Sequence, residues 1–365
     1  MKSLADFKDD INKCSKCGLC QSVCPVYKLT GNDCAVSRGK FVMLDGVLKG
    51  DLKLNKNIIK YIDLCLKCDK CSNFCPSAID VCKIFETAKY EYAKNTFWGK
   101  LIFFFQSKYV FGKFLNIIKK MHEIPNFISR PIANEGKNPQ LTLLYFKGCV
   151  NNIFPQADKF LHKLFDNSNV KIIEKDFDCC GLPFLSSGNL KRYEEVKEHN
   201  LKLLNCDFDY ILTDCASCES TLKSYYNNKK AIPKFISLGE LISQQNIKFH
   251  FANPIKVTFH KPCHLENDNF FKKIMDNCEN VEYIEMNDYD ECCGFAGEFA
   301  IKNRKISSQL SKQKANNVVA TGADYVLTTC PACIIGIKRG LLGIKGAPKV
   351  LSLSDFLAKA DKIIY

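Results

Sequence analysis

The sequence lacks the glycine-rich motifs that bind nucleotides. No G-x-G-x-x-G follows an expected strand, and there is no P-loop. The first thirteen residues also lack the apolar core of a secretory signal and instead carry Asp6, Asp9 and Asp10. We therefore expect a cytoplasmic chain that binds no flavin or nicotinamide, so that any hydride chemistry takes place on a partner.

Acidic residues are too few to balance the basic ones. The chain has 39 Asp and Glu against 52 Lys and Arg, a formal net charge of +13. Such an excess raises the question of nucleic acid or an anionic membrane surface as partner. Much of it is local, because residues 88–140 hold nine Lys or Arg and only three Glu. One basic segment is therefore expected, rather than a surface that binds nucleic acid.

Cysteine is abundant, with 22 residues. In a reducing compartment this number favours metal or redox chemistry over a disulfide framework. Eight of these cysteines form two copies of the pattern C-x2-C-x2-C-x3-C-P, each closed by a proline, Pro25 or Pro76. The copies comprise Cys14, Cys17, Cys20 and Cys24, and then Cys65, Cys68, Cys71 and Cys75.

The spacing within these two runs predicts a pair of interlocked 4Fe-4S clusters. Three closely spaced thiolates can surround one cluster, while the fourth, before the proline, ligates the other cluster. Zinc is the alternative metal for thiolate ligands, but two full copies of the spacing favour iron. The predicted ligand sets are Cys14, Cys17, Cys20 and Cys75 for one cluster, and Cys65, Cys68, Cys71 and Cys24 for the other.

A second cysteine pattern occurs twice in the remainder of the chain. Each copy has one cysteine after an apolar run, then Cys-Cys-Gly, then Cys-x-x-Cys, and equivalent cysteines lie 113 to 115 residues apart. This regular offset indicates an internal duplication. Five thiols are one more than a cubane cluster requires, so either one thiol stays free or the cluster is not a cubane. The candidate metal ligands are Cys149, Cys179, Cys180, Cys215 and Cys218, and then Cys263, Cys292, Cys293, Cys330 and Cys333.

The pattern of apolar residues predicts an α+β multidomain protein. Strands are expected at 141–146, 210–213, 257–259 and 325–328, and helices at 190–204 and 301–319, so each repeat should be an α/β domain with a mostly parallel sheet. The cysteines then lie at strand ends, where loops converge. Helix-like spacing over 40–54 favours an α-helical ferredoxin-type domain. The expected domains are 1–88 (ferredoxin-type), 89–140 (connector), 141–252 (first Cys-Cys-Gly domain) and 253–365 (second Cys-Cys-Gly domain).

The two ferredoxin-type runs followed by two Cys-Cys-Gly repeats, with GCV at 148–150, HKPCH at 260–264 and CPAC at 330–333, resemble the glycolate oxidase iron-sulfur subunit family. The anaerobic glycerol-3-phosphate dehydrogenase C subunit shares this layout, and the heterodisulfide reductase B subunit shares the repeats. The resemblance implies two 4Fe-4S clusters, further clusters at the repeats, and electron transfer from an FAD-containing 2-hydroxyacid (glycolate or lactate) dehydrogenase subunit to quinone or another acceptor. The alternatives are catalytic noncubane clusters that cleave a disulfide, as in heterodisulfide reductases, and glycerol 3-phosphate as substrate.

The connector contains a segment, 97–121, in which aromatic residues alternate with lysines. It has no apolar run near the ~20 residues of a membrane-spanning helix. Two interpretations stay open: a helix on the inner face of the cytoplasmic membrane, which would suit delivery of electrons to quinone, or a helix that faces the core or a partner.

Overall fold

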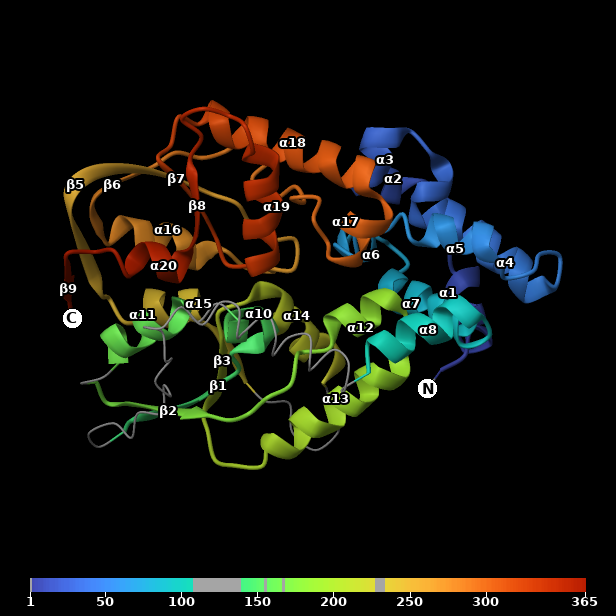
Figure 1. Ribbon diagram of the computed structural model, residues 1–365, viewed down its shortest axis with the longest axis horizontal. Coiled ribbons are helices and arrows are strands. Elements are labelled where there is room, and N and C mark those ends of the chain that lie inside the picture. Colours follow the sequence, from blue (N-terminus) through green and yellow to red (C-terminus); the bar gives the residue numbers. More distant parts are fainter. Residues whose placement is uncertain (1, 108–138, 154–155, 166–167, 227–233) are drawn as a thin grey trace. The chain divides into compact units, whose positions relative to one another are not determined.

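The computed structural model describes residues 2–107, 139–153, 156–165, 168–226 and 234–365 (Figure 1). The chain divides into two compact units. The first contains the described part of residues 1–111 together with 183–194 and 291–314, and the second contains the remaining described residues. Each unit is therefore assembled from segments that lie far apart in the sequence.

Up to Ser107, the regular elements of the first unit are helices. Their bounds are η1 (Leu4–Phe7), α1 (Lys8–Asn12), α2 (Leu19–Val23), α3 (Pro25–Thr30), η2 (Asp33–Ala35), α4 (Ser37–Lys49), α5 (Lys56–Ile62), α6 (Lys70–Asn73), α7 (Val81–Lys94) and α8 (Phe97–Phe105). A core of buried residues from η1, α1, α4, α5 and α7 holds them together. Helix α4 buries Ser37, Lys40, Phe41 and Leu44, which follow one helical face.

The prediction of a helix over 40–54 is partly confirmed, because α4 ends at Lys49. Gly50 takes the left-handed conformation that commonly terminates a helix, with φ 85°. The two later segments of this unit contribute α12 (Leu182–Ser187), α17 (Glu298–Lys302), and the first turns of α13 (Leu190–Leu203) and α18 (Arg304–Ala320).

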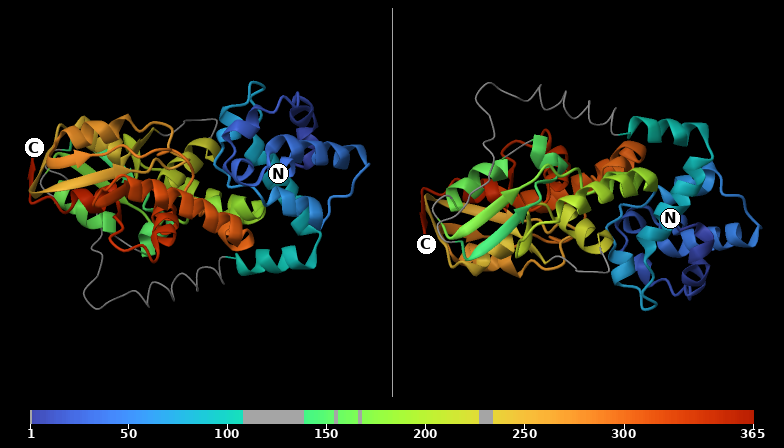
Figure 2. Two further views of the ribbon diagram at one scale, coloured as in Figure 1. Left: turned by 90° about the horizontal axis from the view of Figure 1, so that it is seen from above. Right: turned by 90° about the horizontal axis from the view of Figure 1, so that it is seen from below.

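The second unit contains two sheets with the same strand order. The first sheet runs β2 (Val170–Glu174), β1 (Leu141–Tyr145), β3 (Tyr210–Thr213) and β4 (Phe235–Ser237), all parallel (Figure 2). The second runs β6 (Cys278–Tyr283), β5 (Lys248–Phe259), β7 (Tyr325–Thr328) and β8 (Lys349–Ser352), also parallel. Strand β9 (Lys362–Ile364) pairs antiparallel with the start of β5. The duplicated sequence thus gives a duplicated, mostly parallel topology, as predicted.

Helices follow the strands in this unit, as in other α/β folds. They are α10 (Gly148–Ile153), α11 (Gln156–Phe165), α14 (Ala216–Tyr225), α15 (Leu238–Gln244), α16 (Asn269–Asp276), α19 (Pro331–Leu341) and α20 (Leu353–Leu357). One hydrophobic core contains residues of both sheets and of α11, α15, α16 and α20. The four predicted strands are confirmed, and β3 and β7 have the predicted bounds. Within the described ranges, no helix combines the length and apolarity that a membrane crossing requires.

Candidate metal centres

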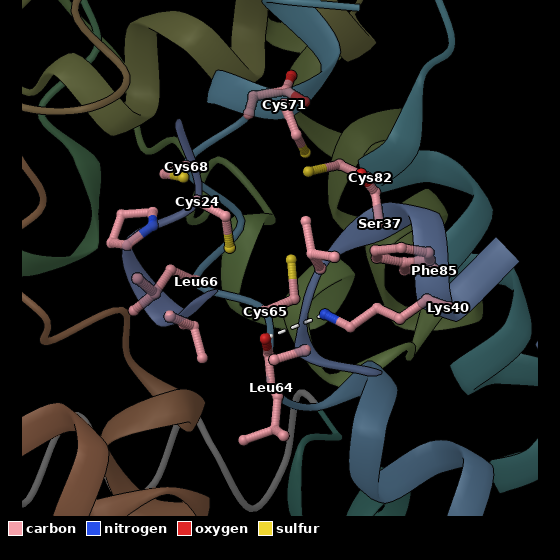
Figure 3. A pocket seen from close by; sticks show the side chains of 15 residues that line it. Cys24, Ser37, Lys40, Leu64, Cys65, Leu66, Cys68, Cys71, Cys82 and Phe85 are labelled. Carbon is pink, nitrogen blue, oxygen red and sulfur yellow. Dashed lines mark hydrogen bonds between the residues drawn. The ribbon is translucent and has the colours of Figure 1, made fainter. Parts of the chain in front are cut away.

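A cavity in the first unit is lined by the thiols of both ferredoxin-type runs. Its lining contains Cys65, Cys68 and Cys71 of the second run together with Cys24, the last cysteine of the first run (Figure 3). Pro25 begins α3, and Cys24 before it is the extended N-cap, so the chain turns at this point and separates Cys24 from its sequence neighbours. This is the set of four thiols that the interlocked assignment requires.

A fifth thiol, Cys82 of α7, also lines this cavity. It hydrogen-bonds to Cys65, and this bond, with help from the charge of Lys40, lowers the pKa of the Cys65 thiol to about 5. The backbone N–H of Lys67 also donates to Cys65 Sγ at 3.4 Å. Burial raises the pKa values of Cys24 and Cys71, and Lys40 opposes both increases. The protein therefore favours negative charge on Cys65 in particular.

Two charged groups line the cavity besides the thiols, Lys40 and Asp69. The ammonium of Lys40, a residue that is 1% exposed, donates to the carbonyl of Leu64 at 3.0 Å and lies 5.0 Å from the ring centroid of Phe85. Among the described residues no carboxylate pairs with it. A buried cation without an acidic partner is costly, so the cavity fits an anionic occupant. Four thiol donors and a buried cation fit a thiolate-bound 4Fe-4S cluster, whose chemistry when bound is one-electron transfer.

The remaining ferredoxin-type thiols belong to a more exposed region of the same unit. Cys17 is exposed, whereas Cys14, Cys20 and Cys75 are partly buried. Burial raises the pKa of Cys14, and the charges of Cys20 and Cys75 add to that increase, which places Cys75 beside the first run. Hydrogen bonds from the backbone of Leu19 and the side chain of Ser15 lower the pKa of Cys17. The nearest guanidinium, Arg38, already pairs with Asp33 at 2.9 Å.

In the second unit, the thiols of the first repeat form a continuous chain at the carboxyl ends of β1, β2 and β3. Cys179 Sγ donates to Cys149 Sγ at 3.3 Å. The thiols of Cys179 and Cys218 hydrogen-bond to Cys180 and lower its pKa. The position before Cys149 favours glycine, since Gly148 has φ 75° and an added Cβ would lie 3.0 Å from Cys218 Sγ. Cys218 also hydrogen-bonds to Cys215, so five thiols from three strand ends lie together at one edge of a parallel sheet.

The two Cys-x-x-Cys motifs meet each other in this unit. Cys215 and Cys330 are the N-cap residues of α14 and α19. The Cys215 thiol hydrogen-bonds to Cys330 and lowers the pKa of Cys330. Ser217 Oγ lies 3.4 Å from Cys330 Sγ and 3.0 Å from His264 Nδ1, next to Cys263. The thiols of the two repeats therefore adjoin rather than forming two separate sites.

Side chains from the following helices hold both Cys-Cys-Gly turns. In the first repeat, Asn200 Nδ2 donates to Cys179 O at 3.1 Å, and the Tyr226 hydroxyl donates to Cys180 O at 3.1 Å. In the second repeat, whose turn belongs to the first unit, Ser311 Oγ donates to Cys293 O at 2.8 Å. The thiols Cys292 and Cys293 are buried there.

We expect Gly294→Ala to destabilise the second Cys-Cys-Gly turn by about 2 kcal/mol or more. Gly294 has φ 77°, and an added Cβ would lie 2.5 Å from Leu310 Cβ, so backbone strain adds to overpacking. Gly322→Ala is the matched control, because Gly322 has φ 63° and nothing lies within 4 Å of an added Cβ. Denaturant unfolding under anaerobic conditions measures the difference. Equal midpoints for the two variants would contradict the close packing at Gly294.

Sequence reasoning missed several residues around these sites, above all Lys40 and Cys82. Lys40 lies on the buried face of α4, one residue before Phe41 and four before Leu44. A lysine on the apolar face of a helix is the sequence signal that could have found it. Cys82 lies outside every cysteine motif, and only the packing of α7 brings it into the cavity.

The segment 97–121 lies largely outside the described residues. Its described part includes α8, where large apolar side chains are exposed, among them Phe97 at 75%, Trp98 at 72% and Phe104 at 62%. These side chains of α8 do not belong to the core.

Comparisons with known proteins agree with this division of the cysteines. Residues 10–79 match the model of the 4Fe-4S dicluster domain, and residues 143–223 and 257–338 each match the model of the Cysteine-rich domain. A crystal structure of a hypothetical protein from Helicobacter pylori has a similar fold, with TM-score 0.51 and 12% identity over 89% of this chain and 67% of that one.

Three curated relatives extend the comparison. An uncharacterized iron-sulfur protein of Methanococcus maripaludis is 28% identical, covering 98% of this chain and 74% of the relative. The B subunit of the fumarate reductase (CoM/CoB) of Methanothermobacter marburgensis is 30% identical, covering 63% of this chain and about half (49%) of the relative. The probable glycolate oxidase iron-sulfur subunit of Bacillus subtilis is 22% identical, covering 96% and 94%. The chain is thus an iron-sulfur protein with one 4Fe-4S dicluster domain and two Cysteine-rich domains, homologous to glycolate oxidase iron-sulfur subunits, to lactate utilization protein A and to the B subunit of fumarate reductase.

Proposed function

We propose that this chain is the electron-transfer subunit of a 2-hydroxyacid oxidoreductase, with glycolate or lactate as substrate. An FAD-containing dehydrogenase subunit would oxidise the substrate, and this chain would carry the electrons through its clusters to quinone or another acceptor. The N-terminal helices would form a ferredoxin-type domain of the α-helical kind, with the interlocked ligand sets given above. The ten cysteines of the two repeats would hold one or two further clusters.

The observation that carries this proposal is the contact between the two kinds of cysteine motif inside the first unit. Glu291, directly before Cys292, pairs with Lys28 at 2.7 Å and with Lys70 at 3.6 Å. Lys70 directly precedes Cys71. Lys28 lies in α3, the helix that begins directly after Cys24. The second Cys-Cys-Gly turn is therefore anchored beside the thiol cavity, a placement that suits electron transfer between the two sites.

The first repeat is tied to the same cavity by its following segment. Lys67, between Cys65 and Cys68, donates to the carbonyl of Leu185 at 2.9 Å and to Glu86 at 2.9 Å. Leu185 follows Cys180 by five residues. The second ferredoxin-type run thus contacts Leu185, which follows the first Cys-Cys-Gly turn, and Glu291, which precedes the second. The residues that hold the clusters would also fix the route between them.

A second candidate function is the reduction of a disulfide at the repeats. Two features favour it: the continuous chain of thiols from Cys149 to Cys330, and the relative whose name includes CoM/CoB. In that reaction, two electrons delivered through the ferredoxin-type clusters would cleave an S–S bond into two thiolates, each of which would take up one proton from solvent.

The exposed aromatic side chains of α8 suit a surface that docks a partner. We propose that the flavoprotein subunit contacts this helix, since the sequence carries no G-x-G-x-x-G motif after a strand and no P-loop, so electrons would enter from a partner. Trp98→Ser with Phe104→Ser should weaken co-purification of the flavoprotein. If the variant instead leaves the membrane fraction with its flavoprotein still bound, the membrane surface is the contact.

Anaerobic affinity purification from the native cells tests the proposed function. We expect a flavoprotein to co-purify, with iron and sulfide in the eluate and reduction of a dye by glycolate, D-lactate or L-lactate. Glycerol 3-phosphate and a disulfide substrate with a reduced dye are the comparison assays. Activity on the disulfide alone, without a flavoprotein, would establish the second candidate and refute the first.

A further inference from the structure

The thiol cavity of Cys24, Cys65, Cys68 and Cys71 has an asymmetric set of charges. Lys40 approaches from α4 and is held by the carbonyl of Leu64, next to Cys65 (Figure 3). Asp69 lies on the connecting loop next to Lys70 and acts electrostatically on Cys71 and Cys82. Lys67 and Glu86 form a buried ion pair nearby, with 2.9 Å between Nζ and Oε1, so these two charges balance each other. Among the described residues that line the cavity, Lys40 and Asp69 are therefore the two charged groups without an ion pair.

We propose that Lys40 raises, and Asp69 lowers, the reduction potential of the cluster held at this cavity. This inference rests on the proposed ligand set but not on the proposed substrate. A 4Fe-4S cluster bound by four thiolates is an anion, and one-electron reduction adds a further negative charge. The net charge around a cluster is one of the factors that set its potential. A nearby cation stabilises the reduced state more than the oxidised state, and a nearby anion does the opposite.

Burial makes the charge of Lys40 effective. An exposed charge would be screened by salt within about 10 Å at 0.1 M ionic strength, whereas a buried charge is screened much less. Lys40 is 1% exposed and, among the described residues, has no acidic partner to cancel its charge. Near the other four thiols, the guanidinium that acts on Cys17 is that of Arg38, and it already pairs with Asp33 at the surface. We therefore infer that the chain uses Lys40 to separate the potentials of its two ferredoxin-type clusters.

The test is a redox titration followed by EPR on the isolated, cluster-loaded protein with chemical mediators. It needs neither a flavoprotein nor a substrate, so its outcome is independent of the proposed function. Lys40→Met should shift one cluster to lower potential and leave the other unchanged. Asp69→Asn should shift the same cluster to higher potential, and Asn tolerates the left-handed conformation of this residue, φ 59°. Cys68→Ser identifies the signal of the affected cluster.

Two further variants separate charge from packing. Lys40→Arg keeps the charge and should keep the potential near that of the wild type. Lys49→Met removes a lysine from the same helix, where it is exposed and paired with Asp45, and should shift neither cluster. If Lys40→Met loses the cluster's iron while Lys40→Arg retains it, the Asp69→Asn titration decides: a shift of that cluster to higher potential supports the proposal, and an unchanged potential overturns it. Unchanged potentials in Lys40→Met, equal shifts of both clusters, or loss of iron in both Lys40 variants would overturn it.

Discussion

Cys24→Ser is expected to lose the cluster of Cys65, Cys68 and Cys71 while keeping the cluster of its own sequence neighbours. Cys24 lines the cavity with those three thiols, and α3 starts after it at Pro25. Replacing one of four thiolate ligands removes a bond to iron that serine does not supply equally. Iron and sulfide analysis should show the loss of one cluster, and EPR should show which signal disappears.

Cys75→Ser should give the reciprocal result, with loss of the cluster of Cys14, Cys17 and Cys20. Cys34→Ser is the matched control, because Cys34 is partly buried in the same unit but lies outside the motifs and does not line the cavity. It should keep both signals. Loss of the same EPR signal in the Cys24 and Cys75 variants would contradict the interlocked ligand sets.

Lys89→Met should destabilise the first unit by about 3 to 5 kcal/mol, the cost of removing one partner from a buried ionic network. Lys89 is 6% exposed and pairs with Asp63 at 2.7 Å and Glu298 at 2.8 Å, and it also donates to the carbonyl of Ser186. Lys302 remains as a second partner of both carboxylates at 2.8 Å, so we expect the lower end of this range.

The same network connects segments of the first unit that are distant in sequence. Asp63 directly follows α5, Ser186 lies in α12 and Glu298 in α17, so Lys89 joins the ferredoxin-type helices to the segments after both Cys-Cys-Gly turns. Burial alone would raise the pKa of Asp63, but the charges of Lys89 and Lys302 lower it. A carboxyl group whose pKa is lower in the folded protein than in the unfolded chain contributes its full stabilisation at pH values above about 4, the ordinary pKa of Asp. This stabilisation is lost as the pH falls through the pKa of the folded state.

Denaturant unfolding at pH 7 therefore measures the whole contribution of the network. Lys83→Met on the same helix is the control: Lys83 forms a half-exposed pair with Asp80, and such pairs contribute at most about 1 kcal/mol. A Lys89→Met midpoint equal to that of the control would show that the network does not stabilise this unit.

Much of the fold followed from local patterns. The strands β3 and β7 were predictable because each is a short apolar run that ends two residues before a cysteine. Their equivalence followed from the nearly constant offset between the repeats. The end of α4 at Lys49 was missed, because the helix-like spacing continues to Leu54 and only the conformation of Gly50 stops it. The residues around the thiol cavity were missed for another reason. Cys82 and Asp69 carry no motif, and their roles depend on which helices pack together.

The sequence by itself determined which cysteines form each motif, the duplication, and the alternation of strand and helix, because spacing and periodicity are local properties of a chain. Only the tertiary structure decided what surrounds the thiols. Packing buries Lys40 and leaves it without an acidic partner in the part of the chain that the structure describes. It also joins residues that are distant in sequence, as in the contact of Cys215 with Cys330 and the ion pairs of Glu291 with Lys28 and Lys70. Such contacts arise from the packing of whole elements, which fixes the electrostatic environment that tunes a redox centre.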